Sequence, residues 1–399
     1  MTARISAENP LQRSGAHAFV LQGGGALGAY QAGVYAALSE HKKALPKWVA
    51  GVSIGAINAA LIAGNAPEHR VEKLRAFWDM VSSSPAQHLP SWLANRATLN
   101  QWSASLASLY GIPGFFKPRL SPALLMGGAA PVLSYYDTSP LKATLEALVD
   151  FDRINAAEVR LSVGAVNVRT GNSSYFDNDD GKQTTRKIGP EHIMASGALP
   201  PGFAPVEIGD DAYWDGGLVS NTPLQYVLDK HPRRHPLTVV QVDLFSARGA
   251  MPHTLSEVLT RQKDITYSSR TRMNTDVLAA NVNLQQAIAD LMDKLPAALK
   301  RDASVKAICE QLTHAPIDIF HLIYRDKAYE GDSKDYEFSR ATMEEHWDAG
   351  MRDMHMTLTN PAALRRGGDV NGVTTFDLGE GGTVRIKRPH ADPVKEHIA

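Results

Sequence analysis

The sequence of 399 residues has little of what several protein classes require. Its single cysteine, Cys309, excludes an intrachain disulfide and leaves no companion thiols for a zinc cluster. The 41 basic and 42 acidic residues nearly cancel, so no overall field attracts nucleic acid or an anionic membrane. The sequence has no H-E-x-x-H motif and no carboxylate cluster with metal-ligand spacing, so we expect no metal, no cofactor and no nucleic-acid partner.

The sequence also lacks the signals of export and membrane insertion. Arg4, Glu8 and Arg13 precede any apolar run, which is unlike a secretory signal. Residues 48–67 form a stretch of 20 residues without a charge, long enough to span a bilayer. Its glycines and asparagines instead favour a strand, a tight turn and a small-residue helix. We expect a cytoplasmic protein with at most a peripheral, transient contact with a membrane or lipid surface.

Short β-rich runs alternate with helical patterns from residue 18 onward. This rhythm predicts a parallel sheet covered by helices, and we expect an α/β fold with three α/β/α layers. The expected strands are 18–22, 47–52, 160–168, 173–176 and 238–245, and the expected helices are 28–38, 54–63, 67–81 and 192–199.

The pattern changes after residue 245, where mainly helical spacing replaces the alternation, with one further strand expected at 317–324. We expect a catalytic domain over 17–248, a mainly helical accessory region over 249–360 and a tail over 361–399. Within the first domain the alternation lapses over 80–136, which contains no Asp or Glu and is interpreted as a cap or insert.

The strongest single motif is Gly51-Val52-Ser53-Ile54-Gly55, a G-x-S-x-G between an expected strand and an expected helix. A nucleophile elbow needs such a turn, because glycines permit close backbone approach and the helix N-terminus favours developing negative charge. The alternative interpretation is a glycine-rich turn in which Ser53 only caps the helix.

A second motif, Gln22-Gly23-Gly24-Gly25-Ala26-Leu27-Gly28, also lies between a strand and a helix. Consecutive glycines can turn their amides toward one point, as an oxyanion hole requires. Gly23, Gly25 and Gly28 also fit G-x-G-x-x-G, but a dinucleotide site needs an acidic residue about 20 positions on, and the region offers only Glu40. The absence of G-K-S/T excludes an ATP-type P-loop.

Two further blocks follow. Asp215-Gly216-Gly217 is an ordinary turn by itself, but beside an elbow serine its carboxylate could accept the Ser53 proton. The block Ala195-Ser196-Gly197-Ala198-Leu199-Pro200-Pro201 by itself is a helix end.

These four blocks, in this order over residues 17 to 245, resemble the patatin-like phospholipase family. The resemblance implies a Ser53–Asp215 catalytic dyad that hydrolyses lipid acyl esters without metal. It implies an oxyanion loop at Gly23, Gly24, Gly25 and Gly28, with support from Gly51, Gly55, Gly216 and Gly217. One position departs from the family pattern, since Leu27 stands where many members carry Lys or Arg.

Two alternatives stay open: an esterase for smaller esters or hydroxyacid oligomers, and a non-catalytic lipid-binding protein. For the catalytic base, His231 and His235 are candidates besides Asp215, although both lie in a polar loop. The sequence does not specify the oligomeric state. In the cap, we expect Phe115 and Phe116 to contribute more to activity on aggregated long-chain lipid than to activity on a soluble short ester. The alternative is that both are ordinary core residues.

Overall fold

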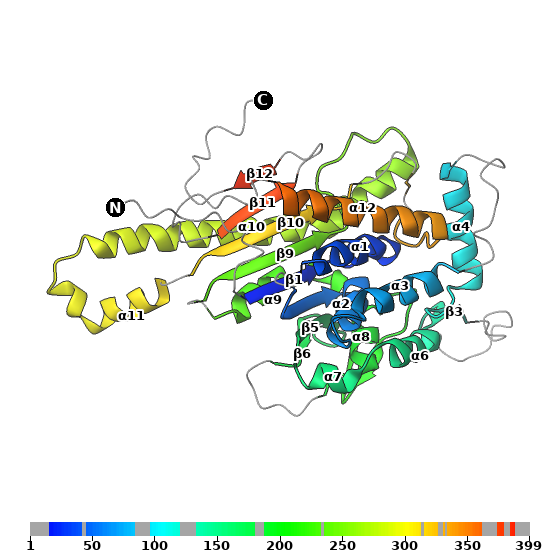
Figure 1. The fold of residues 1–399 in the computed structure, drawn as a ribbon, viewed down its shortest axis with the longest axis horizontal. Coiled ribbons are helices and arrows are strands. Elements are labelled where there is room, and N and C mark those ends of the chain that lie inside the picture. Colours follow the sequence, from blue (N-terminus) through cyan, green and yellow to red (C-terminus); the bar gives the residue numbers. More distant parts are fainter. Residues whose placement is uncertain are drawn as a thin grey trace.

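The computed structural model describes 16–41, 45–83, 96–119, 133–179, 187–232, 235–312, 315–325, 330–331, 333–360, 373–378 and 384–387. These residues form a sheet packed between helices, with a helical arm that projects from one end (Figure 1).

A mixed sheet of ten strands lies at the centre of the described residues, in the order β12-β11-β10-β9-β1-β2-β5-β8-β7, with β6 beside β5. The strands β1, β2, β5, β9, β10 and β11 run parallel, whereas β6, β7, β8 and β12 pair antiparallel with their neighbours. Their bounds are β1 Ala16–Leu21, β2 Trp48–Val52, β5 Arg160–Asn167, β6 Ser173–Asp177, β7 Val206–Ile208, β8 Asp211–Asp215, β9 Leu237–Asp243, β10 Ile317–Ile323, β11 Val373–Leu378 and β12 Val384–Lys387.

Helices cover both faces of this sheet, which confirms the predicted three-layer α/β/α fold. In β1, Phe19 and Leu21 belong to a large core with helices α1, α2, α3 and α12, whereas Ala18 and Val20 pack toward α9 on the opposite face. Because β1 is buried on both faces, residues 18–21 form a continuous apolar run. The bounds of these helices are α1 Gly28–Ser39, α2 Ile54–Ala63, α3 Arg70–Val81, α9 Leu224–Lys230 and α12 Arg340–Thr359.

The region after residue 248 is mainly helical, as predicted, but its strands belong to the same sheet. β10 pairs with β9 in parallel along its whole length, from Ile317 opposite Leu237 to Ile323 opposite Asp243. The tail, in which the sequence shows no long period, adds β11 and β12 at the edge of the sheet. The six residues of β11 do not alternate strictly between apolar and polar, and β12 has only four residues, so neither gives a clear periodic signal. The division at residue 248 therefore runs through one continuous sheet.

Helix α12 packs closely on α1. A Cβ atom on Gly33 would lie 2.0 Å from the carbonyl oxygen of Trp347, and a Cβ atom on Gly350 would lie 2.1 Å from that of Tyr30. Glycines on both helices thus allow their backbones to approach. The Tyr30 hydroxyl also donates a hydrogen bond to Asp353 at 2.6 Å. The C-terminal region is therefore fastened to the first helix of the fold.

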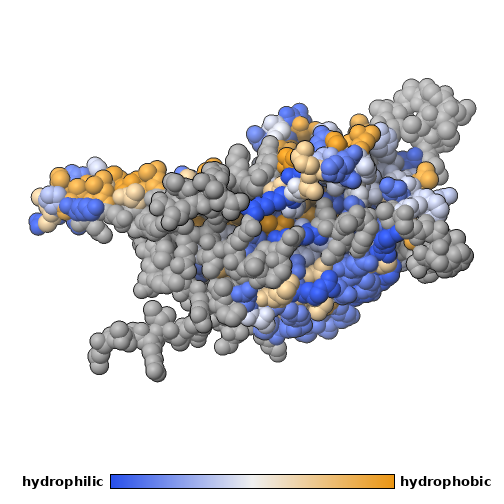
Figure 2. Space-filling view, turned by 90° about the horizontal axis from the view of Figure 1, so that it is seen from above, coloured by the Kyte–Doolittle hydropathy of each residue, from blue (hydrophilic) through white to orange (hydrophobic). Residues whose placement is uncertain are grey.

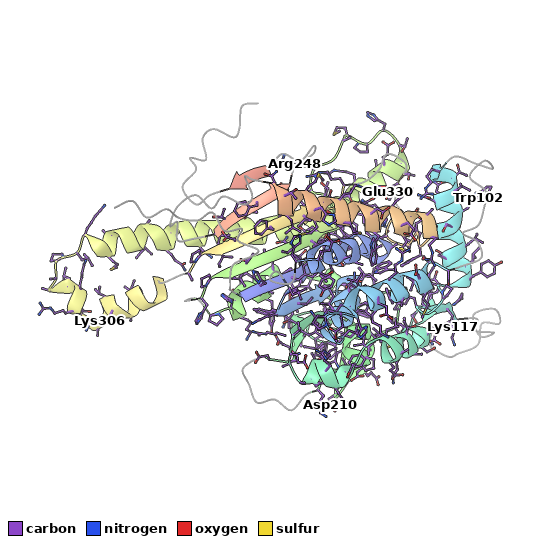
Figure 3. All side chains as sticks on the ribbon, in the orientation of Figure 1. Trp102, Lys117, Asp210, Arg248, Lys306 and Glu330 are labelled. Carbon is purple, nitrogen blue, oxygen red and sulfur yellow. The ribbon has the colours of Figure 1, made fainter. Side chains whose placement is uncertain are left out.

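A long helix, α10 (Leu255–Asp293), continues beyond the sheet and forms the projecting arm with α11 (Ala303–Leu312). Lys306 on this arm and Trp102 lie at opposite ends of the molecule (Figure 3). Figure 2 shows apolar residues gathered along the arm. Val277, Leu284 and Leu291 are 52%, 60% and 56% exposed. Among the described helices, none is both long and apolar enough to cross a membrane.

The expected insert at 80–136 contains α4 (Arg96–Tyr110) and the short strands β3 (Lys117–Pro118) and β4 (Tyr136–Asp137). Phe115 and Phe116 are each only 8% exposed and pack against the ring of Phe203. This favours the interpretation of both rings as core. Residues 84–95 and 120–132 lie outside the described residues. The remaining helices are α6 Ser139–Leu148, α7 Phe151–Asn155 and α8 Pro190–Ser196.

Gly33→Ala should destabilise the protein, because the added methyl group must displace the backbone of α12. Overpacking of this kind costs about 1–3 kcal/mol and outweighs the gain in helix propensity, about 1 kcal/mol. Urea unfolding should show the loss in the free energy of unfolding. Gly197→Ala is the matched control, since its added Cβ would meet only the Met194 carbonyl oxygen, at 3.9 Å. Equal stability of the two variants would contradict the tight packing of α1 on α12.

Candidate active site

Ser53 occupies a sharp turn between β2 and α2. Its backbone has φ 56° and ψ −126°, a conformation that L-residues rarely adopt. The flanking glycines make room for the turn, because a Cβ on Gly51 would lie 2.2 Å from the Gly55 carbonyl oxygen. A Cβ on Gly55 would lie 2.5 Å from that of Leu21. The strain and the crowding are those of a nucleophile elbow, which presents the serine at the carboxyl end of a strand.

Strand β5 brings Asp215 to this turn. Val52 pairs with Gly164 of β5, and Asp215 pairs with the next residue, Ala165. β6 pairs with the opposite side of β5, so β2 and β8 both lie on the remaining side of that strand. The end of β8 therefore lies next to the end of β2. The Ser53 side chain consequently lies near the Asp215 carboxylate, close enough to favour its ionised form. Two residues far apart in the sequence meet because they share one neighbouring strand.

The Asp215 carboxylate is buried and only 3% exposed. Burial raises its pKa from 3.8 to about 6, while the hydrogen bonds from the Ser53 hydroxyl and the Gly217 amide act in the opposite direction. The Gly217 amide donates to Asp215 Oδ1 at 2.7 Å. The carboxylate is therefore a stronger base than an exposed Asp and remains mostly ionised at pH 7.

The glycine loop lies against the same turn. A Cβ on Gly23 would lie 3.0 Å from the Ser53 Cβ atom. The Ala26 amide donates to the Asp335 carbonyl oxygen, and the Leu27 amide donates to that of Gly24. Within the described residues, the Gly24 and Gly25 amides have no hydrogen-bond acceptor. These two donors are therefore available to an oxyanion.

The other sequence-predicted glycines mark close contacts around this centre. A Cβ on Gly28 would lie 2.5 Å from the Ile54 side chain, and one on Gly216 would lie 2.7 Å from the Gly164 carbonyl oxygen. A Cβ on Gly217 would lie 3.1 Å from the Asp215 carboxylate. The structure thus brings all ten predicted residues to one region: Ser53, Asp215, Gly23, Gly24, Gly25, Gly28, Gly51, Gly55, Gly216 and Gly217.

A sequence model described as patatin-like phospholipase matches residues 19–228, and a second, described as patatin phospholipase, matches residues 265–369. The first covers more than half of the chain. The chain belongs to the patatin-like phospholipase family. No curated protein sequence matches this patatin-like chain.

Two solved structures resemble the patatin-like chain at low identity. VipD from Legionella pneumophila is 13% identical, with a TM-score of 0.35 over 87% of this chain and 67% of that chain. The human GIVD cytosolic phospholipase A2 is 9% identical, with a TM-score of 0.36 over 89% of this chain and 64% of that chain. The patatin-like chain thus spans about two thirds of the length of each.

Ser196, which the sequence alone places at an ordinary helix end, is a buried support of the elbow. Its hydroxyl oxygen accepts a hydrogen bond from the Ser53 amide at 2.9 Å and donates one to the Gly164 carbonyl oxygen at 2.5 Å. It therefore ties the Ser53 backbone to β5. The available signal for this role was the Ala195-Ser196 pair before the double proline. Only the resemblance to the family gave that block any significance.

Asn221 and Gln22 also support the site and were missed. The Asn221 side-chain amide donates to the Gly23 carbonyl oxygen at 2.9 Å. The fully buried Gln22 accepts hydrogen bonds from the amides of Leu244 and Phe245 and donates to the Thr222 hydroxyl. The available signals were the polar residue Gln22 directly after β1 and the polar residue Asn221 after the Asp-Gly-Gly turn. Their hydrogen-bond partners are separated from them by 198 to 223 positions in the sequence, so the sequence could not identify them.

The structure weakens the dinucleotide interpretation of the glycine loop. Glu40 lies at the C-terminal end of α1, whereas the loop lies at its N-terminal end. Twelve helical residues separate the two by about 18 Å, at about 1.5 Å per residue. Glu40 also contacts His355 at 3.0 Å.

Among the described residues, no histidine takes part in the site. Position 27, which is Leu27, supplies no cation to it. The hydrogen bonds of Ser53 and Asp215 reach Ser196 and Gly217 and, among the described residues, no histidine. His231 instead contacts the His235 carbonyl oxygen. Leu27 is fully buried in the main core. Within the described part of the chain, no group of three His, Cys, Asp or Glu side chains could hold a metal ion.

The raised pKa of Asp215 predicts a pH-dependent difference between the wild type and Asp215→Asn. Folded Asp215 binds its proton with a pKa of about 6, against 3.8 ordinarily, so the folded state holds more protons between these values. The free energy of unfolding therefore falls as pH rises through this window, by about 2 kcal/mol between about pH 4.5 and 7. Urea unfolding should show this fall in the wild type relative to Asp215→Asn. Parallel pH profiles would contradict a buried, ionised Asp215.

Proposed function

We propose that this patatin-like chain is a serine hydrolase that cleaves acyl esters of lipids, as a phospholipase A, lysophospholipase or related lipid acyl hydrolase. The observation that carries the proposal is that β5 brings the buried Asp215 carboxylate to the strained turn that holds Ser53. Membership in the family supports lipid acyl hydrolysis in general, and the geometry supports the assignment of these two residues.

In the proposed reaction, Ser53 Oγ attacks the ester carbonyl carbon while its proton passes to Asp215. The carbonyl oxygen becomes an oxyanion, which the amides of Gly24 and Gly25, and of Ile54 at the start of α2, would hold by hydrogen bonds. The C–O bond to the leaving alcohol then breaks, and Asp215 returns the proton to that alcohol. Asp215 next takes a proton from water, whose oxygen attacks the acyl carbon. The bond between this carbon and Ser53 Oγ then breaks, the acid leaves, and Asp215 returns the proton to Ser53 Oγ.

Exposed aromatic and aliphatic side chains support a peripheral contact with lipid. On α4, Trp102, Leu109 and Tyr110 are exposed, as is Tyr135 before β4. Residues of this kind suit the boundary between water and acyl chains. We infer that this part of the insert, rather than Phe115 and Phe116, meets the lipid surface.

Ser53→Ala should abolish turnover while the protein stays folded, because it removes only the attacking oxygen. We expect a loss of about a thousandfold or more in kcat. Asp215→Asn should lose nearly as much, and the double variant little more, because the two residues act as one unit. The measurement is hydrolysis of a soluble short-chain ester by purified protein, with circular dichroism to verify folding. Multiplying losses in the double variant would show that another base serves Ser53.

The same proposal predicts the pH dependence of hydrolysis. Asp215 can accept the Ser53 proton only when ionised, and its pKa is about 6. kcat/KM should therefore fall about tenfold per pH unit below this value and level off above it. Initial rates from about pH 3 to 8 on a soluble ester would test this. An acid limb near pH 4 would show that the base is a carboxylate in water, and one absent altogether would exclude Asp215 as the base.

A graded panel of esters and phospholipids separates this proposal from its two alternatives. A lipid hydrolase should turn over long-chain phospholipid or lysophospholipid faster than short esters. Preference for short esters or hydroxyacid oligomers would identify a small-ester esterase. Binding of lipid vesicles without turnover of any ester, equal in the wild type and Ser53→Ala, would identify a lipid-binding protein.

A further inference from the structure

The glycine loop beside Ser53 is held by a segment from the C-terminal region. The Ala26 amide donates a hydrogen bond to the Asp335 carbonyl oxygen at 2.8 Å. A Cβ atom on Gly25 would lie only 1.9 Å from that oxygen, so the backbone of Asp335 lies directly on the loop. Gly25 has φ +55°, and because a glycine has no Cβ atom, its own backbone dihedral angles are little restricted. A contact from outside the loop, such as the one with Asp335, therefore helps to fix its conformation.

The residue before this contact, Lys334, forms a buried ion pair. Its ammonium lies 2.6 Å from a carboxylate oxygen of Asp264 on α10, and the two side chains are 0% and 8% exposed. The same ammonium lies 5.5 Å from the centre of the Phe245 ring, which follows β9. A buried pair contributes little net stability but allows few alternative arrangements, because either charge left alone in the interior is costly.

Helix α10 contacts the site at two further points. Lys263 pairs with the Asp335 carboxylate at 2.7 Å. The carbonyl oxygen of Tyr267 accepts a hydrogen bond from Gln22, the residue that precedes the glycine loop. The turn of α10 from Lys263 to Tyr267 thus fastens both the 334–335 segment and the start of the loop.

We propose that Lys334 is a positioning residue for the oxyanion loop. Its ion pair with Asp264 fixes the Asp335 carbonyl, which holds the Ala26 amide and so orients the neighbouring Gly24 and Gly25 amides toward the reacting carbonyl. The inference rests on the proposed function and gives the C-terminal region a part in it: the loop from the catalytic domain is completed by residues that follow residue 248.

Lys334→Met tests the proposal, because it keeps the length of the side chain and removes the charge. We expect kcat on a soluble short ester to fall about tenfold to a hundredfold with KM nearly unchanged, since misdirected donors affect the transition state. Hydrogen exchange by mass spectrometry should show faster exchange in the peptide that contains Ala26. This second readout does not depend on activity.

Arg160→Met is the matched control. Arg160 forms an ion pair with Asp177 at 2.9 Å, with side chains 17% and 1% exposed, at the opposite end of β5 from the site. It should lower thermal stability without changing kcat or exchange in the loop. The double variant Lys334→Met/Asp264→Leu removes both charges and should fold stably, yet keep the low kcat; it carries the test if Lys334→Met alone fails to fold.

Unchanged kcat in a folded Lys334→Met or double variant would overturn the positioning role, as would unchanged exchange of the loop. A fall in kcat that Arg160→Met reproduces at equal stability would also overturn it, since it would reflect general destabilisation. Full activity of Ser53→Ala would instead defeat the proposed serine mechanism, whatever the exchange measurement shows. The two failures are therefore distinguishable.

Discussion

A carboxylate kept out of water is the constraint on which the site depends. The Gly217 amide donates a hydrogen bond to buried Asp215, and this bond and the nearby Ser53 hydroxyl favour the ionised carboxylate. Those donors require a strained serine and a glycine turn, and each needs its own backbone room. The small residues around the centre, Gly51, Gly55 and Gly216 among them, follow from that requirement. Burial raises the proton affinity of the Asp215 carboxylate, and the donors around it limit that rise.

The sheet supplies the convergence. β5 is the shared neighbour of β2 and β8, so it aligns the serine turn with the aspartate turn, and Ser196 attaches the serine backbone to β5. On the other side of β1, Gln22 joins the glycine loop to the end of β9. The protein thus assembles its site from strand ends at one edge, as parallel α/β sheets commonly do.

Local patterns allowed much of this to be predicted from the sequence. Helix α2 begins and ends where its apolar pattern predicts, and the glycines on both sides of Ser53 identified the elbow. What the sequence could not show depends on distant partners. Nothing near Asp335 or Lys334 indicates that they contact a loop and a helix encoded elsewhere. β11 does not alternate strictly between apolar and polar residues, and β12 has only four residues. The burial that raises the pKa of Asp215 is likewise a property of the whole fold.

The order of the strands bears on how this chain is made. β1 carries the glycine loop, yet one of its two neighbours in the sheet is β9, so that Ala16 must pair with Leu237. During synthesis, β1 therefore keeps one edge unpaired until residues 237–243 have been made, and such edges invite mispairing. The position of the glycine loop beside Ser53 is likewise complete only once β9 has joined β1.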